Sequence, residues 1–267
     1  MARSRPLLAL AWLAGFTLID ASIVSLALPD IAADFGRTVG DLAWVATGYL
    51  LALAATLLAA GRLSDRFGMR RVLVSGAIAF LITTAACGLA PDFELLVAAR
   101  VVQGMAGGVL YTVSLAIAVT AYPPERRASA LALYFTSGAL GAVIGPVIGG
   151  LLTDLGGWRL VFLAQLPLPL VVAVAAWLLL PKAAAPGKRP FDVAGIAAAS
   201  LFVVAGTFAL LELPAAGASL SVVGSGLVAL ASLAAFLVIE SRTPEPAVQL
   251  GIFRNARFVV GSVAGAG

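Results

Sequence analysis

Long apolar runs separated by short polar connections determine what this chain can fold into. The runs cover residues 7–28, 42–61, 72–90, 94–121, 128–152, 159–180, 193–213 and 219–239. About 20 residues of helix cross a hydrocarbon core of about 30 Å, so each run is long enough to span a membrane. Charged residues make up 11% of the chain and hydrophobic residues 61%, a balance that a water-soluble fold could not cover. The sequence predicts an all-α, polytopic membrane protein with eight complete spans.

The polar connections divide the spans into groups. Six spans form a transporter-like helical unit over residues 1–180, and a linker containing Pro, Ala and basic residues covers 181–192. Two additional spans occupy 193–240, and a connector with the start of a ninth helix occupies 241–267. The ninth apolar run begins only at Phe258, too late to cross a bilayer before Gly267. We therefore expect a six-helix half-bundle, two extra helices and a truncated ninth helix.

The basic residues orient the predicted spans. With the N-terminus in the cytoplasm, fourteen of the seventeen Lys and Arg residues lie inside, Arg37 and Arg159 lie outside, and Arg100 lies within a span. Cytoplasmic loops of membrane proteins carry such an excess of Lys and Arg. We expect a multi-pass protein of the cytoplasmic membrane, and we attribute its net charge of +4 to orientation in the lipid bilayer rather than to nucleic-acid binding.

Several kinds of chemistry are excluded by composition. The chain has no histidine, which removes imidazole catalysis and histidine metal sites. Its one cysteine, Cys87, cannot form an internal disulfide or a thiolate cluster. No phosphate-binding loop or hydrolase motif occurs, and polar stretches of at most about 17 residues are too short for a nucleotide-binding domain. We expect no enzyme activity, no metal and no cofactor.

Two charged residues fall inside predicted spans. Asp20 lies about 20 Å into the hydrocarbon core at about 1.5 Å per residue, and Arg100, entering from the other side, reaches a similar depth. Charges at this depth are costly, so the two side chains could pair, with Gln103 one turn below as a hydrogen-bonding partner. Asp20 is either a proton or cationic-substrate site or a structural carboxylate. Arg100 either pairs with it or extends to the outer surface.

The segment GRLSDRFGMRR is a candidate cytoplasmic gating loop. It either supplies only positive charge, or holds Asp65 in a tight turn bracketed by two glycines. In the second case the Asp65 carboxylate accepts a hydrogen bond from a helix N-terminus, or forms an ion pair with an arginine across the cytoplasmic opening. Such a contact could form in one conformation of the transporter and break in another. The candidate residues are Gly61, Asp65, Arg66, Gly68, Arg70 and Arg71.

Glycines recur every four residues in the fifth span, in the segment GALGAVIGPVIGG. This spacing places them on one helix face, where another helix can pack closely. Pro146 kinks the helix or frees a carbonyl group. A single pair of glycines four residues apart is common in membrane helices, whereas three glycines at this spacing together with a proline indicate a specialised helix contact. The candidate residues are Gly141, Gly145, Pro146, Gly149 and Gly150.

These segments, in this order, resemble the major facilitator superfamily, and most of all its drug:proton antiporters with fourteen spans. The segment from Asp20 to Pro29 resembles the first-span motif LDxTIVNVALP, with Ser22 for Thr and Ser25 for Asn. The start of the second span is matched by Trp44, Thr47 and Tyr49. The loop motif GxLxDRxGRR is matched by Gly61, Leu63, Asp65, Arg66, Gly68, Arg70 and Arg71, with Met69 in place of a basic residue.

Three further motifs match later in the chain. The fourth-span motif RxxQG is matched by Arg100, Gln103 and Gly104. The antiporter motif GxxxGPxxGG is matched by Gly141, Gly145, Pro146, Gly149 and Gly150. The sixth-span motif WRWxFxxNxP is matched by Trp158, Arg159, Phe162 and Pro167, with Leu160 for the second Trp and Gln165 for Asn.

The resemblance implies a role for each matched segment. Asp20 takes part in proton or substrate coupling, and Arg100 helps to set the protonation of that carboxylate. The Gly61–Arg71 loop gates the cytoplasmic side, and the fifth-span glycines pack against the opposite half. The implied function is proton-coupled export of hydrophobic or cationic drug-like compounds.

Members of this subfamily have six spans, two extra spans and six more. We therefore expect the chain to be the N-terminal part of a transporter, whose other half lies in the same or a separate chain. Two alternatives remain open at this point: a transporter of another small metabolite with the same fold, and a non-transporting scaffold or half-protein that needs a partner chain.

Overall fold

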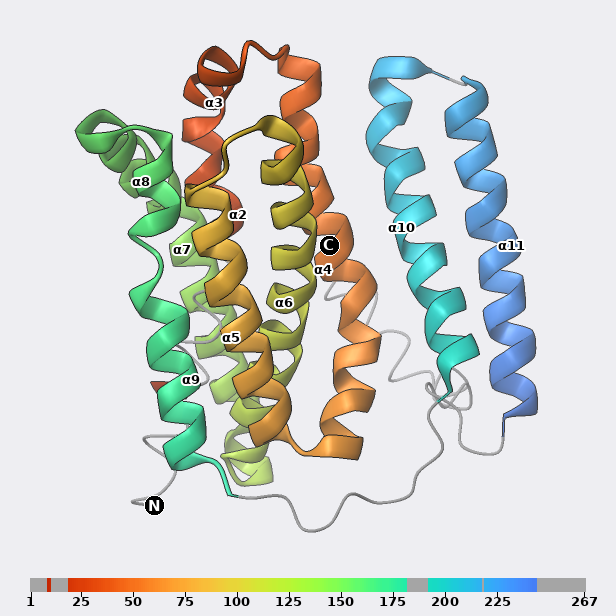
Figure 1. Cartoon of the computed structure of the whole chain (residues 1–267). Helices are drawn as coiled ribbons and strands as arrows, with labels where there is room; N and C mark the ends of the chain where they lie inside the picture. The colour runs from red at the N-terminus through yellow and green to blue at the C-terminus, as the bar shows by residue number, and fades with distance from the viewer. Residues whose placement is uncertain (1–8, 11–18, 182–191, 218, 244–267) are drawn as a thin grey trace. The chain divides into compact units, whose positions relative to one another are not determined.

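The structure is a computed structural model that describes residues 9–10, 19–181, 192–217 and 219–243 (Figure 1). In these residues all regular structure is helical, and seven helices are long and apolar enough to cross a membrane. They coincide with the second to eighth predicted spans, which confirms the all-α polytopic fold. Most of the predicted first span's inner part, the linker and the ninth helix lie outside the described residues.

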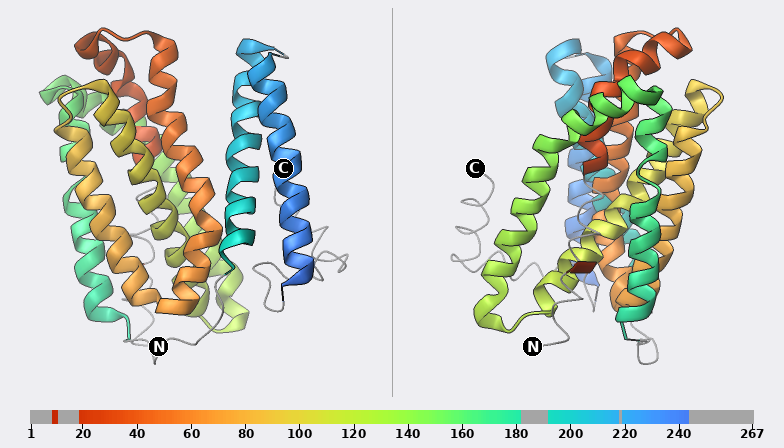
Figure 2. Two further views of the ribbon diagram at one scale, coloured as in Figure 1. Left: turned by 45° about the vertical axis from the view of Figure 1, so that its right-hand side comes forward. Right: turned by 90° about the vertical axis from the view of Figure 1, so that its left-hand side faces the viewer.

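The helices fall into two compact units, one within residues 1–187 and the other within 188–267. The second unit contains α10 (Val193–Ala216) and α11 (Leu220–Arg242), which pack against each other along their length (Figure 2). The long helices of the first unit are α4 (Val39–Phe67), α5 (Met69–Gly88), α6 (Phe93–Thr120) and α7 (Arg127–Gly156).

The first span is an interrupted helix. Its described part runs through α2 (Ile19–Ile23) and the 3₁₀ segment η2 (Val24–Ala27), and α3 (Leu28–Phe35) continues the helix beyond the predicted end of the span at residue 28. Pro29 has no backbone N–H, and its ring cannot be placed against the Ser25 carbonyl as an α-helix requires. The helix therefore tightens just before the proline, immediately beyond the turn that carries Asp20.

The sixth span is also interrupted, although its apolar run predicted one continuous helix. It consists of α8 (Trp158–Leu163) and α9 (Pro167–Leu179). The backbone N–H of Gln165 donates to the Phe162 carbonyl at 3.0 Å. This bond spans three residues, as in a 3₁₀ turn, whereas the bonds of an α-helix span four. Pro167 lacks the N–H that would have continued the α-helical pattern, which explains the break.

The connection between α4 and α5 differs from the predicted loop. Gly61 lies inside α4, which continues to Phe67, and α5 begins at Met69. The prediction that two glycines bracket a tight turn is therefore wrong. Gly68 alone reverses the chain, with φ 85° and ψ 142°, a left-handed conformation that favours glycine.

Two glycines bring α4 and α6 into close contact. A Cβ added to Gly104 would collide with the main-chain carbonyl of Tyr49, and one added to Gly108 would lie 2.6 Å from the Leu53 carbonyl oxygen. Side chains at these positions would push the two helices apart. The glycines therefore fix how closely α6 approaches α4.

Three glycines of α7 make a second close contact, with α2. A Cβ added to Gly141, Gly145 or Gly149 would collide with atoms of this helix. The atoms belong to Ile19, Ser22 and Ile23. The resemblance implied that this row packs against the opposite half of a transporter. In this structure the row packs against the first span of the same unit, and the contact with the opposite half stays a prediction.

Pro146 and Gly150 are not in this glycine row. The helix α7 continues through Pro146, which leaves the Ala142 carbonyl without its helical donor because proline has no N–H. A Cβ on Gly150 would lie 3.4 Å from the Leu26 side chain. Of the predicted antiporter motif, the glycine row therefore makes the closest contacts with the first span.

Polar contacts tie α3 to α8 at the end of the first unit opposite the α4–α5 connection (Figure 1). The Asp34 carboxylate accepts from Trp158 Nε1 at 3.0 Å and from Arg159 Nη1 at 2.7 Å. Arg159 Nη2 also donates to the Ala90 carbonyl at 3.3 Å, beyond the end of α5. The hydrogen bond from Arg159, followed by that from Trp158, lowers the pKa of Asp34.

We predict opposite effects for two alanine substitutions in α7. Gly149→Ala should lower the thermal unfolding midpoint in detergent, because overpacking costs about 1–3 kcal/mol. Gly138→Ala is the matched control, since its Cβ would meet nothing within 4 Å and alanine favours a helix by about 0.5–1 kcal/mol over glycine. Equal midpoints for the two variants would contradict the close α2–α7 contact.

We predict an acid-sensitive contribution of Asp34 to stability. A lowered pKa stabilises the folded state above the unfolded-state pKa of about 3.9, and this contribution is lost as the pH falls through the folded-state value. Wild type should therefore unfold at a higher temperature than Asp34→Asn at pH 7, and the difference should shrink below about pH 4. The exposed Asp30→Asn is the control. A difference independent of pH would contradict the assignment.

Candidate functional site

The site begins with a carboxylate inside the membrane-spanning unit. Asp20 lies on α2, which precedes the 3₁₀ segment, and its side chain is completely buried. Arg100 lies on α6 and is also completely buried. Arg100 Nη1 forms an ion pair with Asp20 Oδ2. The structure thus brings together the two charged residues singled out by sequence.

Arg100 is held by more than the ion pair. Its Nε donates to the Val45 carbonyl at 3.0 Å, and its Nη1 also donates to Gln103 Oε1 at 2.7 Å. The side chain therefore points into the bundle and does not extend to the outer surface, which was the alternative left open by the sequence. Three separate segments, α2, α4 and α6, supply its partners.

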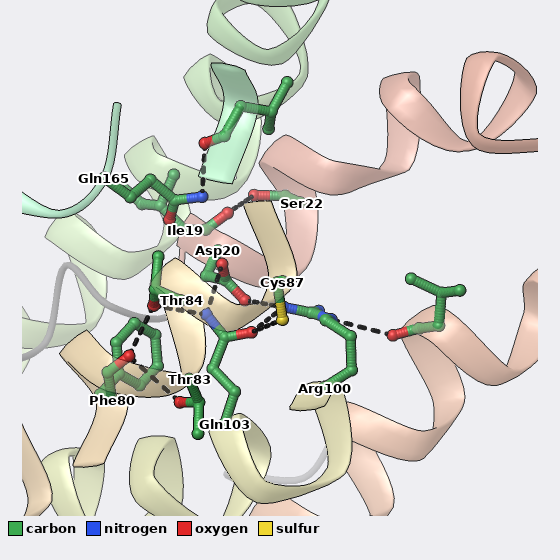
Figure 3. Close-up of polar contacts among 12 residues, drawn as sticks. Ile19, Asp20, Ser22, Phe80, Thr83, Thr84, Cys87, Arg100, Gln103 and Gln165 are labelled. Carbon is green, nitrogen blue, oxygen red and sulfur yellow. Dashed lines mark hydrogen bonds and ion pairs between the residues drawn. The ribbon is translucent and has the colours of Figure 1, made fainter. Parts of the chain in front are cut away.

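Gln103 links the ion pair to α5 (Figure 3). Its Nε2 donates to Thr84 Oγ1 at 2.8 Å and lies 3.4 Å from Asp20 Oδ1. The Cys87 thiol donates to Gln103 Oε1 at 3.5 Å, and the Thr84 hydroxyl donates to the Phe80 carbonyl at 2.7 Å. The amide side chain therefore joins the charged pair to the hydroxyl and thiol of the neighbouring helix.

Tyr49 completes the cluster from α4. Its ring is completely buried, and the Arg100 guanidinium carbon lies 4.2 Å from the ring centre. A cation that lies over an aromatic face is stabilised most strongly where water is excluded. Together with Asp20, Gln103 and Thr84, Tyr49 encloses Arg100 in a site without solvent contact.

Sequence reasoning missed Thr84 and the role of Tyr49. Thr84 lies in an apolar span, where a hydroxyl ordinarily bonds to its own helix, so nothing local marks it as a partner of Gln103. Tyr49 was noted only as part of a second-span match. Its place over Arg100 depends on the close approach of α4 to Gly104, which no local pattern reveals.

A proton is the smallest ligand that could change this arrangement. As a carboxylate, Asp20 neutralises Arg100, and removing one partner of a buried ion pair typically costs about 3–5 kcal/mol. Protonation of Asp20 would remove that attraction while leaving Arg100 charged. A change in the protonation state of Asp20 would therefore alter the contacts that Arg100 makes among α2, α4 and α6.

The predicted gating residues lie at the other end of α4. Asp65 is about 24 Å along the helix from Tyr49, at about 1.5 Å per residue. It is exposed and makes no hydrogen bond or ion pair within the described part of the chain. Arg70 stacks on Trp177 of α9, with its guanidinium carbon 4.2 Å from a ring centre. The structure does not bring these residues to Asp20.

No group of three or more metal-binding side chains occurs among the described residues. The site consists instead of one carboxylate, one guanidinium, one amide and neighbouring hydroxyl, thiol and aromatic groups. Such a set can hold or release a proton and can favour or oppose a nearby cation. It offers no arrangement for bond-making chemistry.

Comparison with known proteins agrees with this fold. The sequence profile of the Major Facilitator Superfamily matches residues 10–239. The peptide transporter POT has a solved structure that superimposes with a TM-score of 0.64 at 18% identity, over 89% of this chain and 52% of that one. At this identity the likeness shows the fold alone.

Two curated relatives show closer sequence similarity. The tetracenomycin C resistance and export protein of Streptomyces glaucescens is 36% identical over 268 residues, which cover 98% of this chain and 49% of the relative. A multidrug resistance protein B homolog of Mycobacterium tuberculosis is 36% identical over 240 residues, or 89% of this chain and 44% of the relative.

This chain spans about half the length of the curated relatives it matches. The family and these relatives consist of transport proteins rather than enzymes. The profile match covers most of the chain and all seven described membrane helices lie within or overlap it. The chain is therefore a multi-pass membrane protein that belongs to the major facilitator superfamily.

Proposed function

We propose that the chain is the N-terminal part of a transporter that exports hydrophobic or cationic drug-like compounds across the cytoplasmic membrane in exchange for protons. The observation that carries the proposal is the completely buried cluster of Asp20, Arg100 and Gln103 inside a membrane-spanning unit. A buried carboxylate in a transporter is a proton-coupling candidate because hydrocarbon makes an uncompensated charge costly.

The class of substrate is inferred from the relatives. One is named for resistance to and export of tetracenomycin C and another for multidrug resistance. An antibiotic-type compound is therefore favoured over an amino acid or a siderophore. The proposal also includes a second helical half, in the same chain or a separate one, because these relatives are about twice as long as the matched region.

The proposed coupling depends on a competition between a proton and Arg100 for the negative charge of the Asp20 carboxylate. When Asp20 is ionised, its charge is matched by Arg100; when it is protonated, the guanidinium loses that partner. Transport in this superfamily involves rocking of two halves around a central site. A proton on Asp20 would loosen the contact between α2 and α6 and so favour a different arrangement of the first span.

The proposed orientation places the α4–α5 connection in the cytoplasm. Four arginines lie in or beside this connection, namely Arg62, Arg66, Arg70 and Arg71. The opposite end carries Asp30, Asp34 and Glu94 together with Arg37 and Arg159. This asymmetry supports a cytoplasmic N-terminus through the excess of basic residues on that side.

We predict that Asp20→Asn in the complete transporter abolishes pH-driven export. Asparagine retains the size of the side chain but cannot take up or release the coupling proton. Inside-out vesicles with an imposed pH gradient and a fluorescent lipophilic cation give the measurement. Export should fall to the rate of vesicles that lack the transporter, while probe binding to the purified protein persists.

Asp30→Asn is the matched control for this experiment. Asp30 lies on the same span as Asp20 but is exposed, so its neutralisation should leave export unchanged. Full pH-driven export by Asp20→Asn would exclude the coupling role. Export by wild type that is unaffected when the pH gradient is collapsed would exclude proton exchange itself.

A further inference from the structure

Tyr49 carries a feature that its ring contact with Arg100 does not explain. Its hydroxyl group is buried and has no hydrogen-bond partner among the described residues. Arg100 Nη2, in the same cluster, is also buried without a partner. Buried polar groups are satisfied in the great majority of cases, so two exceptions in residues that stack on each other call for a reason.

The position of Tyr49 is closely constrained. Its main chain is in contact with Gly104, and its hydroxyl would lie only 2.9 Å from a Cβ added to Gly107. A phenylalanine would fill the same space against the apolar neighbours without leaving a polar atom unpaired. Packing alone therefore explains the ring of Tyr49 but not its hydroxyl.

The polar side chains around Asp20 limit what could hold Arg100 after a proton arrives. The groups that face the pair are Gln103 from α6, Thr84 and Cys87 from α5, and Tyr49 from α4. The α7 face against α2 consists of glycines. The amide oxygen of Gln103 already accepts from Arg100 and Cys87. Tyr49 Oη is the remaining oxygen without a partner in the described cluster.

We infer that Tyr49 is a positioning residue for proton coupling, an inference that rests on the proposed function. Its ring supports the Arg100 guanidinium while Asp20 is ionised. When Asp20 takes a proton, Arg100 stays charged, loses its anionic partner and shifts along the ring, so that Nη2 donates to the Tyr49 hydroxyl. The two orphan groups of the ionised state thus become partners in the protonated state.

The inference predicts how removal of the hydroxyl changes the titration of Asp20. Tyr49→Phe keeps the ring but removes the partner available to Arg100 in the protonated state. Protonation of Asp20 then becomes less favourable, and its midpoint should move to lower pH by about one unit, the size expected for one hydrogen bond to a charged group.

Infrared spectroscopy can measure this midpoint without transport. The full protein is reconstituted in lipid nanodiscs and titrated while the carboxylic-acid C=O band is recorded. The band that disappears in Asp20→Asn identifies the Asp20 signal. Thermal unfolding of each variant in the same nanodiscs verifies that it is folded.

Tyr134→Phe is the matched control. Tyr134 is also buried, but its hydroxyl lies 2.7 Å from Ser114 Oγ and outside the Asp20 cluster. Its removal should leave the Asp20 midpoint unchanged. A midpoint in Tyr49→Phe that equals that of Tyr134→Phe, or that moves to higher pH, would overturn the inference.

The two proposals fail in different ways. Failure of the proposed coupling role of Asp20 would appear as pH-driven efflux that survives Asp20→Asn, whatever the infrared result. Failure of the Tyr49 inference would appear as an Asp20 band whose midpoint is unshifted in Tyr49→Phe, even where Asp20→Asn abolishes efflux. If the inference holds, the pH dependence of export should also move to lower pH in Tyr49→Phe.

Discussion

The ion pair between Asp20 and Arg100 is the interaction on which the first helical unit depends. Neither side chain has access to solvent, and a single charge in such surroundings would be strongly destabilising. Each charge therefore requires the other, which holds α2 beside α6. The Arg100 bond to the Val45 carbonyl and its stack on Tyr49 bring α4 into the same arrangement. Any change in the charge of Asp20 acts on all three segments.

Glycines make this arrangement sterically feasible. At Gly104 the main chain of α6 comes against that of Tyr49, and at Gly149 the main chain of α7 comes against the Ile23 carbonyl. Larger side chains at these positions would push α6 away from α4 and α7 away from α2. The glycine row of α7 thus contributes to the site indirectly, because it positions the segment that carries Asp20.

Two carboxylates, Asp20 and Asp34, hold the first span and its continuation α3 against other helices, and we expect them to respond differently to a change of pH. The helix α3, which continues this span, is tied to α8 through Asp34, which is partly exposed and whose pKa is lowered by Arg159. The span itself is tied to α6 through the buried Asp20. The 3₁₀ segment Val24–Ala27 lies between these two contacts. Near neutral pH the α3–α8 contact persists, so a proton on Asp20 would release the span at α2 while α3 stays in place.

Sequence patterns alone were sufficient to predict the helical class, the seven described spans and the candidates Asp20, Arg100 and Gln103. A long apolar run in hydrocarbon must form a helix, and a charge inside such a run is easily identified. The packing of the helices was needed to show that Arg100 turns inward, that the α7 glycines contact α2, and that Thr84 and Tyr49 join the site. These facts depend on which helices become neighbours. Helix contact is set by side-chain shape across segments far apart in the chain, which local periodicity does not encode.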